Sequence, residues 1–415
     1  MSGPSANPGG RSPLLFIFLT VFIDLLGFGI VLPLLPIYSL EHRASEAEIG
    51  LLFGSFSAMQ FLFAPLWGRL SDRVGRKPIL VGGLFGTAGS YLLFAYAGSL
   101  PMLFASRMLA GFFGANVSTA QAYIADVTTP ENRARGMGLI GAAFGLGFML
   151  GPLIGGELTR VSIHAPGLAA AALSATAATF GWLKLPEPAR VRGASVSRLF
   201  RLVQVRRAIS DPRLGVLFVL SFFFIASFSA FESMFTLYGI ERFPTWFGMP
   251  EGAELSTANA LAAAPWAGRY MGVIGLIAAV IQGGFIRRLV PRYGETTLAT
   301  AGPAVLAVSL LVIAGCVLMP FGFGINNPSL FGLISRASPA DEQGAYLGLN
   351  QSVSSLARMC GPVTAGSLFH AFGASAPFLA ASAVLSVCAL VAYGYRARYA
   401  ATFPRAAAGA SPAAE

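Results

Sequence analysis

Charged residues are scarce in this sequence. Lysine, arginine, aspartate and glutamate make up 11% of its 415 residues and hydrophobic residues 55%, whereas an ordinary soluble domain is about 25% charged. This shortage excludes a soluble globular fold. Uncharged runs such as Pro78 to Ser106 and Leu214 to Phe231 are long enough to cross a hydrocarbon core about 30 Å thick as helices. Because the runs are continuous rather than alternating, they predict an all-α polytopic membrane protein and not a β-barrel.

Cysteine and histidine are also rare, with three of each. Neither type shows the spacing of a metal site, a redox pair or a catalytic triad, and the chain has no G-x-x-x-x-G-K-[ST] loop for ATP. We therefore predict no bound metal, no cofactor and no enzymatic activity. The net charge of +10 does not indicate nucleic acid as a partner, because the basic residues lie between hydrophobic runs. The partner that the composition indicates is the lipid bilayer.

The hydrophobic runs divide the chain into twelve predicted membrane spans, two pseudo-symmetric bundles of six helices. The spans are Pro13 to Ser39, Ile49 to Trp67, Pro78 to Gly98, Pro101 to Asp126, Gly136 to Leu158, Gly167 to Leu185, Arg213 to Gly239, Tyr270 to Val290, Thr296 to Gly315, Cys316 to Ile334, Gly344 to Phe369 and Pro377 to Tyr395. The predicted organisation is a tail at 1–12, a first six-helix bundle at 13–185, a linker at 186–212, a second six-helix bundle at 213–395 and a tail at 396–415.

The distribution of basic residues orients the chain. With an even number of spans both termini lie on one side, which holds twenty-two of the twenty-eight Lys and Arg residues; the other side holds four, and two lie inside spans. Because cytoplasmic connections are enriched in Lys and Arg, we predict that both termini are cytoplasmic. The six arginines of 186–212 suit a cytoplasmic linker and equally a charged rim against anionic lipid.

The two halves of the chain resemble each other. A G-P-x-x-x-G pattern in the fifth span recurs in the eleventh after 210 residues, and the same shift relates positions in the fourth and tenth spans. The matched pairs are Gly114 and Gly324, Asn116 and Asn326, Gly138 and Gly348, Gly151 and Gly361, Pro152 and Pro362, and Gly156 and Gly366. A weaker match, GRLSDRVGRKP at 68–78 with GFIRRLVPRYGE at 284–295, has a shift of 216 and predicts a six-residue deletion in the second half. Two parallel halves fit alternating access about a central cavity.

The charged stretch GRLSDRVGRKP lies in the predicted link between the second and third spans. Its pattern, G-x-L-x-D-R-x-G-R-[RK], resembles the signature loop of the major facilitator superfamily. Further resemblance lies in IDLLGFGIVLPLLP at 23–36, in SRMLAGFFGANVSTAQAYIADVTTPENRARG at 106–136 and in GAAFGLGFMLGPLIGG at 141–156. The last is similar to the antiporter motif of proton-coupled drug exporters, and the chain as a whole resembles the tetracycline-resistance type of exporter.

The resemblance implies roles for two sets of residues. It implies that Asp72 caps a helix of the opposite half and that Arg76 pairs with Asp126, contacts that hold the outward-facing state shut on the cytoplasmic side. Plain positive-inside topology explains the arginines but not Asp72. The predicted cytoplasmic latch consists of Gly68, Asp72, Arg73, Gly75, Arg76 and Asp126. The predicted antiport motif consists of Gly147, Gly151, Pro152, Gly155 and Gly156, small residues that also suit ordinary close packing.

Four charged residues lie inside predicted spans, where each costs about 2.5–3.5 kcal/mol on insertion scales. They are Asp24, Arg107, Glu232 and Arg358. We predict Asp24 as the proton-coupling group, since removal from water favours a protonated carboxyl and the approach of Arg107 favours the ionised form. The alternative is a static Asp24–Arg107 pair that only orients helices. Glu232 is a second proton-coupling candidate, and Arg358 either binds an anionic substrate or neutralises Glu232.

Polar residues at helical spacing predict a substrate cavity. One stripe runs along the fourth span from Arg107 to Gln121, and another along the eleventh from Gln351 to Arg358. The predicted cavity residues are Gln60, Asn116, Gln121, Asn326, Gln351 and Arg358.

The leading functional prediction is a secondary transporter that exports small amphiphilic organic compounds or drugs in exchange for protons. Its energy source is the proton gradient, and its functional unit is a monomer. One alternative is a proton-coupled carrier of an organic anion or metabolite, by symport or uniport, and another is a receptor or scaffold that does not transport. The insertion cost of the intramembrane charges argues against a scaffold. Ser90 stands where tetracycline exporters have an acidic residue, so chelated tetracycline is not the expected substrate.

Overall fold

The computed structural model describes residues 13–114, 116–128, 130–188, 207, 210–252, 257–311, 315–339 and 343–402, and within these ranges the chain is helical without any strand. The first half comprises α1 (Pro13–Val31), η1 (Leu32–Leu34), α2 (Leu35–Glu41), α3 (Glu46–Val74), α4 (Arg76–Ala95), α5 (Leu100–Phe113), α6 (Asn116–Val127), α7 (Pro130–Leu158) and α8 (Ala165–Lys184). The second half comprises α10 (Pro212–Arg242), η2 (Pro244–Phe247), α11 (Thr257–Val280), η3 (Ile281–Phe285), α12 (Ile286–Tyr293), α13 (Glu295–Leu311), α14 (Gly315–Ala337), α15 (Gln343–Phe372), α16 (Ala376–Tyr399) and η4 (Ala400–Thr402).

Each of the twelve predicted spans overlaps one helix or consecutive helices of the described chain. The first span is α1 and α2, joined through η1 at Pro33, and the fourth is divided into α5 and α6. The eighth span was predicted to begin at Tyr270 but begins at Thr257, because Pro265 lies inside α11 without ending it. Arg269, predicted to lie in a loop, is therefore part of this helix.

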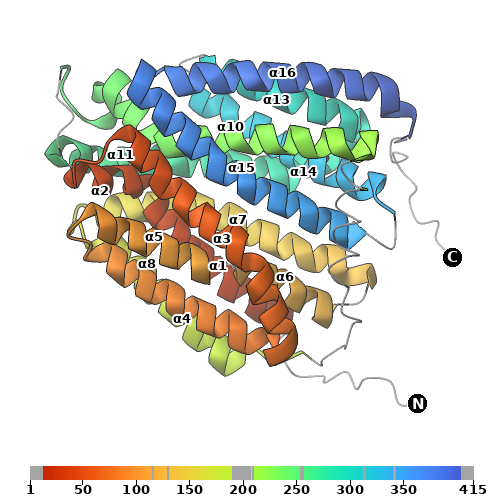
Figure 1. The fold of residues 1–415 in the computed structure, drawn as a ribbon, viewed down its shortest axis with the longest axis horizontal. Helices are drawn as coiled ribbons and strands as arrows, with labels where there is room; N and C mark the ends of the chain where they lie inside the picture. The colour runs from red at the N-terminus through yellow and green to blue at the C-terminus, as the bar shows by residue number, and fades with distance from the viewer. Residues whose placement is uncertain are drawn as a thin grey trace.

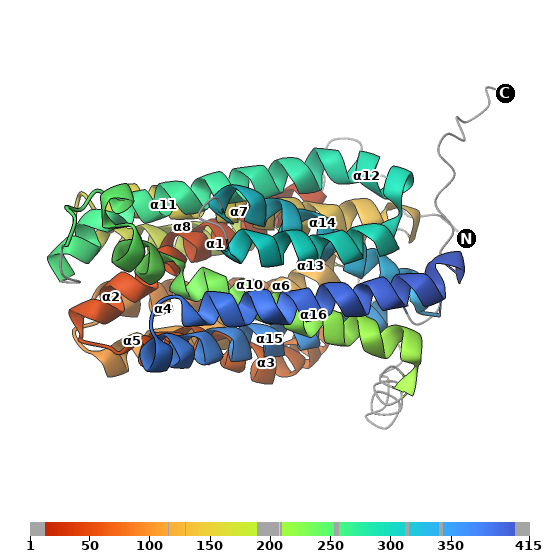
Figure 2. The ribbon, with the colours of Figure 1, turned by 90° about the horizontal axis from the view of Figure 1, so that it is seen from above.

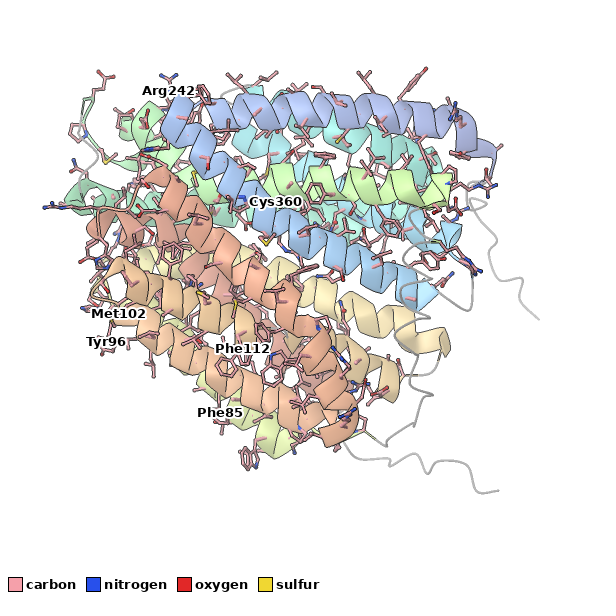
Figure 3. The ribbon with its side chains drawn as sticks, viewed as in Figure 1. Phe85, Tyr96, Met102, Phe112, Arg242 and Cys360 are labelled. Atoms are coloured by element: carbon pink, nitrogen blue, oxygen red, sulfur yellow. The ribbon has the colours of Figure 1, made fainter. Side chains whose placement is uncertain are left out.

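Six helical segments of the described chain are by themselves long and apolar enough to cross a membrane. They are Leu14–Glu41, Glu46–Val74, Arg76–Ala95, Pro212–Arg242, Ala258–Val280 and Ala376–Thr402. The pair α12 and α13 qualifies only jointly and bends by 116°. Two shorter apolar helices of the described chain are Leu100–Phe113 and Ala142–Leu158. Phe85, Tyr96 and Met102 point outward from the first half (Figure 3), as a surface facing lipid requires.

The structural repeat includes the turn after α3. α3 ends before Gly75 and α12 ends before Gly294, and both glycines have positive φ, 123° and 80°. Side chains disfavour this backbone conformation, so glycine is required at each turn. The two glycines lie 219 residues apart, whereas the motif match predicted 216. Between this turn and the Gly114–Gly324 pair, the second half is therefore shorter than the first by nine residues, and not by the predicted six.

The two halves contact each other at one end of the bundle. We call the end where α1 begins and α16 ends the termini end, and the opposite end the far end (Figures 1 and 2). One buried cluster contains residues of both halves, among them Ile30, Phe231 and Met271. Two other clusters belong to single halves, one around Tyr123 and one around Tyr346. Within the described residues the halves are thus joined at the far end, and α3 and α15 separate toward the termini end (Figure 1).

Two matching backbone contacts join the halves. They are Gly50 of α3 against Pro362 and Gly366 of α15, and Gly268 of α11 against Pro152 and Gly156 of α7. A side chain at Gly50 or Gly268 would overlap the opposing proline carbonyl. The repeated G-P-x-x-x-G pattern therefore has a structural reason, because each copy forms the surface on which a glycine of the other half packs. We call these two contacts the glycine contacts.

The antiport motif has a second face, inside the first half. Gly147, Gly151 and Gly155 lie against α1, where added side chains would meet the backbone of that helix. Pro152 and Gly156 instead face α11 across the interface between the halves. α7 therefore connects the core of the first half to the contact with the second, so close packing and a part in closure coincide in this motif.

We expect Gly268→Leu to separate α7 from α11 at the far end, because inserting carbon atoms into a well-packed site costs about 1–3 kcal/mol. The inserted side chain destabilises only the joined state. The ratio of open to joined far ends should therefore rise by roughly fivefold or more. In a background without the native cysteines, a cysteine introduced at Ala264, which is fully buried, should react faster with a polar thiol reagent. The matched control is Gly82→Leu, since nothing lies within 4 Å of a Cβ there. An unchanged rate in Gly268→Leu would contradict the contact's role.

Candidate functional site

Asp24 lies in the middle of α1, with a partly buried side chain. Ser174 of α8 is fully buried and donates a hydrogen bond to its carboxylate, with 3.3 Å between Oγ and Oδ1. No cation forms a direct ion pair with Asp24 in the part of the chain that the structure describes. A carboxylate with one weak hydroxyl contact and no counter-ion is well placed to bind and release a proton.

Arg107 of α5 is 2% exposed and lies against two aromatic rings of α4. Its guanidinium carbon is 5.7 Å from the centre of the Tyr91 ring and 5.2 Å from that of Phe94. Such cation–π contacts offset part of the cost of removing the charge from water. Nε and Nη2 have no hydrogen-bond partner among the described residues. The static Asp24–Arg107 pair is therefore not formed in this conformation, because the aromatic rings hold the guanidinium.

Tyr91 is a site residue that the sequence analysis missed. It is 2% exposed and interacts electrostatically with both Asp24 and Arg107. Its ring contacts the guanidinium on one side, so it connects the two charged groups without bringing them together. A tyrosine in an apolar span gives no signal of this kind in the sequence, since only the packing of α4 against α5 shows its neighbours.

Glu232 of α10 and Arg358 of α15 are both partly buried. They interact electrostatically across the contact between these helices, although no direct ion pair joins them in the described chain. Of the two roles considered for Arg358, neutralisation of Glu232 is favoured by this proximity. Their partial exposure leaves room for a further partner, so binding of an anion stays open.

The two acidic groups lie at different depths in the bundle. Gly29 of α1 and Ala226 of α10 occupy equivalent positions, each packed against the first glycine of the G-P-x-x-x-G pattern in its own half. Asp24 lies five residues before this level and Glu232 six residues after it. At a rise of 1.5 Å per residue, about 16 Å separate them along the bundle axis. Asp24 is thus displaced toward the termini end, and Glu232 lies in the joined far end.

Other predicted cavity residues serve helix packing. Gln60 of α3 donates to the carbonyl oxygen of Gly114 at 3.0 Å, where it supports the break between α5 and α6. Asn326 is fully buried against Gly302, and neither of its amide atoms has a hydrogen-bond partner in the described residues. It lies between α13 and α14, and not on a cavity surface, because Gly302 lets the helices approach closely. The remaining residues are Gln121 and Gln351, which are partly buried, and Asn116, whose side chain lies outside the described residues.

Arg76 is the central residue of the latch. Its guanidinium pairs with Asp126, with 2.8 Å between Nε and Oδ2, and with Asp72, with 2.6 Å between Nη1 and Oδ1. The same Nη1 donates to the Ser71 hydroxyl at 2.7 Å. The expected contact between Arg76 and Asp126 is therefore present, while its part in holding one state shut stays a prediction.

The expected contact of Asp72 with the opposite half is absent from the described residues. Its side chain is 60% exposed and reaches only Arg76, one helical turn away. Arg73 is exposed as well, and no atom lies within 4 Å of a Cβ built at Gly68. The physical reason is the separation of the halves at the termini end. In this conformation the latch is assembled within the first half and disengaged from the second.

Glu187 is a second residue that the sequence analysis missed. The backbone N–H groups of Arg76 and Lys77 donate to its carboxylate at 2.7 and 2.9 Å, which satisfies donors that a helix N-terminus otherwise leaves unpaired. Next to it, the carbonyl oxygen of Pro186 accepts a hydrogen bond from Tyr123 at 2.7 Å. The first residues of the linker are thus bound to the latch. The P-E-P sequence signalled only a loop, because the partner helix lies 110 residues earlier in the chain.

The second half contains the ion pair of the latch with its charges exchanged. Glu295 and Arg76 each follow the turn glycine and begin a helix, and Arg336 lies 210 residues after Asp126. Arg336 Nη1 is 3.2 Å from Glu295 Oε2. Burial raises the pKa of Glu295, and the neighbouring Arg336 opposes that rise. The repeat therefore preserves the ion pair between these two helices and not the order of its charges.

Known proteins resemble this chain over most of its length. The family described as Major Facilitator Superfamily matches residues 17–362 and 296–414. The tetracycline resistance protein, class C, of Escherichia coli is 32% identical over 375 residues, which cover 87% of this chain and 90% of that protein. The crystal structure of the human organic anion transporter MFSD10 (TETRAN) aligns with a TM-score of 0.68 at 27% identity and covers 93% of this chain and 100% of that one. A bacterial homologue of the human lysosomal transporter Spinster, at a TM-score of 0.74 and 14% identity over 97% of this chain and 100% of that one, supports the fold alone.

We expect Glu187→Ala to destabilise the first half by about 0.5–2 kcal/mol, the usual cost of losing an N-cap. The apparent unfolding temperature of the purified protein, followed by thermal denaturation in detergent, should fall accordingly. Glu187→Gln should retain most of the stability, since its amide oxygen still accepts one of the two hydrogen bonds. Glu251→Ala is the control, because Glu251 is exposed in a loop at the far end. Equal unfolding temperatures for Glu187→Ala and the unsubstituted protein would show that the cap is not stabilising.

Proposed function

The chain belongs to the major facilitator superfamily of transporters, and from this premise we propose that it exports small amphiphilic organic compounds across the bacterial inner membrane in exchange for protons. It is not an enzyme. The coupling ion, the direction of transport and the class of cargo are the parts that we propose. The positions of Asp24, Arg107 and the joined far end support these parts.

The observation that carries the proposal is the depth of Asp24 relative to the joined far end. With the halves apart at the termini end, Asp24 lies on the side of the bundle that is not closed by the cluster shared between them. If the termini are cytoplasmic, as the count of Lys and Arg predicts, Asp24 exchanges protons with the cytoplasm in this state. After the halves rock to the opposite state it would exchange them with the outside. One carboxyl that faces each side in turn carries protons down their gradient.

The contacts of Arg107 explain why a proton is the counter-ion. Tyr91 and Phe94 hold the guanidinium, so it does not neutralise Asp24. An ionised carboxylate in a membrane span is costly, and a proton neutralises it by bonding to one oxygen, without further ligands. Neutralisation by a proton removes the cost of moving the carboxylate through the closed intermediate between the two states.

Aromatic side chains beside Asp24 indicate the class of cargo. Phe28, one helical turn after Asp24, lies 5.2 Å from Phe56 of α3 and 5.9 Å from Phe148 of α7 between ring centres. All three are partly buried. Apolar and aromatic walls with one charged group suit a lipophilic molecule that carries a basic group. Such a cargo would compete with the proton for Asp24, which is the competition that antiport requires.

Export of an organic anion is the second candidate. Arg358 is partly buried and has no direct ion pair in the described chain, and the human relative of known structure is named as an organic anion transporter. An anion bound at Arg358 would take the place of Glu232 as its electrostatic partner. This candidate differs from the first in its charge requirement, since it needs Arg358 and tolerates loss of Asp24.

We expect Asp24→Asn to abolish transport driven by a pH gradient in proteoliposomes, because the amide cannot carry a proton, while the protein stays folded by thermal denaturation. Under the main proposal Arg358→Gln should retain transport of a lipophilic cation. Under the organic-anion alternative, Arg358→Gln should abolish transport and Asp24→Asn should retain it. Gradient-driven flux that is unchanged in Asp24→Asn would remove this residue from the coupling mechanism. Cargo that moves in the same direction as the protons would replace antiport by symport.

A further inference from the structure

Each glycine contact is accompanied by an ion pair at the far end of the bundle. Beside the contact of α7 with α11, Arg269 Nη2 lies 2.6 Å from Glu157 Oε1. Beside the contact of α3 with α15, His370 Nδ1 lies 2.9 Å from Glu46 Oε2. Both pairs connect one half of the protein to the other. They are therefore made only when the far end is joined.

The two pairs differ in one chemical property. Arginine stays charged throughout the physiological range, so the Arg269–Glu157 pair is an ion pair at any pH at which the glutamate is ionised. A histidine ring changes charge between about pH 5 and 8, so the His370–Glu46 contact is an ion pair in acid and a neutral hydrogen bond in alkali. Of two contacts at corresponding places in the interface, only one responds to pH in this range.

The charged groups nearest to His370 are acidic. Elements packed against α15 are α3, α10, α14 and α16. At the far end α3 contributes Glu46 and Glu48, and Glu48 interacts electrostatically with His370. Hydrogen bonds from the Ser45 backbone and hydroxyl lower the pKa of Glu48, so it stays ionised in mild acid. α16 and the described far part of α14 carry no charge there.

α10 contributes the other charged groups, Glu241 and Arg242. Arg242, labelled at the far end in Figure 3, donates to the Ser375 hydroxyl at 3.0 Å, and the bond thus ties it to the turn before α16. The His370 side chain itself is 60% exposed and that of Glu46 29%. The imidazole is therefore in direct exchange with the solvent at the far end, and its near neighbours on α3 are acidic.

We propose that His370 and Glu46 form a proton-binding site, separate from the membrane-embedded carboxyls, through which acid at the far end stabilises the joined state. Protonation of His370 adds a charge interaction that exists only while α3 and α15 are in contact. The stabilisation is present while the imidazole is charged and absent when the ring is neutral. The Glu46 carboxylate is the acceptor in this contact.

The consequence for transport rests on the proposed function and orientation. If the far end faces outside, an acidic exterior favours closure of that end after protons have been taken up. The same gradient that drives antiport would then also bias the step that carries the protons inward. Because exposed ion pairs contribute little, the expected bias is modest, about 1.5- to fivefold in the ratio of joined to open states.

The inference is tested by the distance between spin labels at Val161 and Glu251, exposed far-end positions in the first and second half. Labels are attached in a background without the native cysteines, and the ratio of short to long distances is measured at pH 5 and pH 8 in lipid nanodiscs. The ratio should be higher at pH 5 by the factor given above. In His370→Gln the part of this pH dependence that comes from His370 should disappear. In His370→Arg the ratio of short to long distances should equal that of the unsubstituted protein at pH 5, at both pH values.

Arg269→Gln is the matched control. It removes the other inter-half ion pair, so it should lower the ratio at both pH values and leave its pH dependence intact. Asp24→Asn separates this inference from the proposed function, because it leaves His370 unchanged. A pH dependence that persists undiminished in His370→Gln overturns the inference, whether or not it disappears in Asp24→Asn. A pH dependence lost in His370→Gln and kept in Asp24→Asn supports it even if the proposed coupling at Asp24 fails.

Discussion

Direct contact between helix backbones at two equivalent glycines is the constraint on which the rest of this structure depends. Gly50 and Gly268 have no side chain, so α3 and α11 can each lie against a proline carbonyl of the other half. Such contacts are short-range and involve little flexible side chain, and they are therefore either made or broken, with few intermediate arrangements. An interface of this kind allows two halves to rock as rigid bodies. It also explains why the joined end contains one cluster of buried residues from both halves, whereas the other end contains one for each half.

The charged groups are arranged around this constraint. Asp24 lies on the termini side of the level of Gly29 and Ala226, and Glu232 lies on the far side of that level. Ion pairs that connect the halves lie at the far end, and the latch pairs around Arg76 and Glu295 lie within single halves at the termini end. Each individual interaction is worth about 1 kcal/mol or less when exposed. Small biases are sufficient for a transporter, since its two states must interconvert readily and thus differ by only a few kcal/mol.

Much of the fold could be predicted from the sequence, and much of the site could not. Scarce charge, the basic side and the 210-residue repeat give the spans and the two halves, because membrane insertion and an internal repeat impose these patterns on local sequence. The superfamily follows from the resemblance of GRLSDRVGRKP and three further motifs to a known family. The place of Asp24 inside an apolar span also identified it as a candidate site residue. The partners were not predictable, since Tyr91, Glu187 and His370 act through residues on other helices, and neither tyrosine nor an exposed histidine stands out in a span. Asn326 was predicted from its sequence match with Asn116 to line the cavity. In the structure it is fully buried between α13 and α14 instead.

The central claim is that the two halves rock about the glycine contacts, so that one end closes as the other opens. It is tested most directly by measuring two distances in the same preparation: one across the far end, between Val161 and Glu251, and one across the termini end, between Arg73 and Arg398, all exposed positions. Addition of a transported cargo should redistribute both, and the fraction with a long far-end distance should equal the fraction with a short distance at the termini end. Two distances that lengthen together, or one that changes while the other stays fixed, would contradict rocking about this interface.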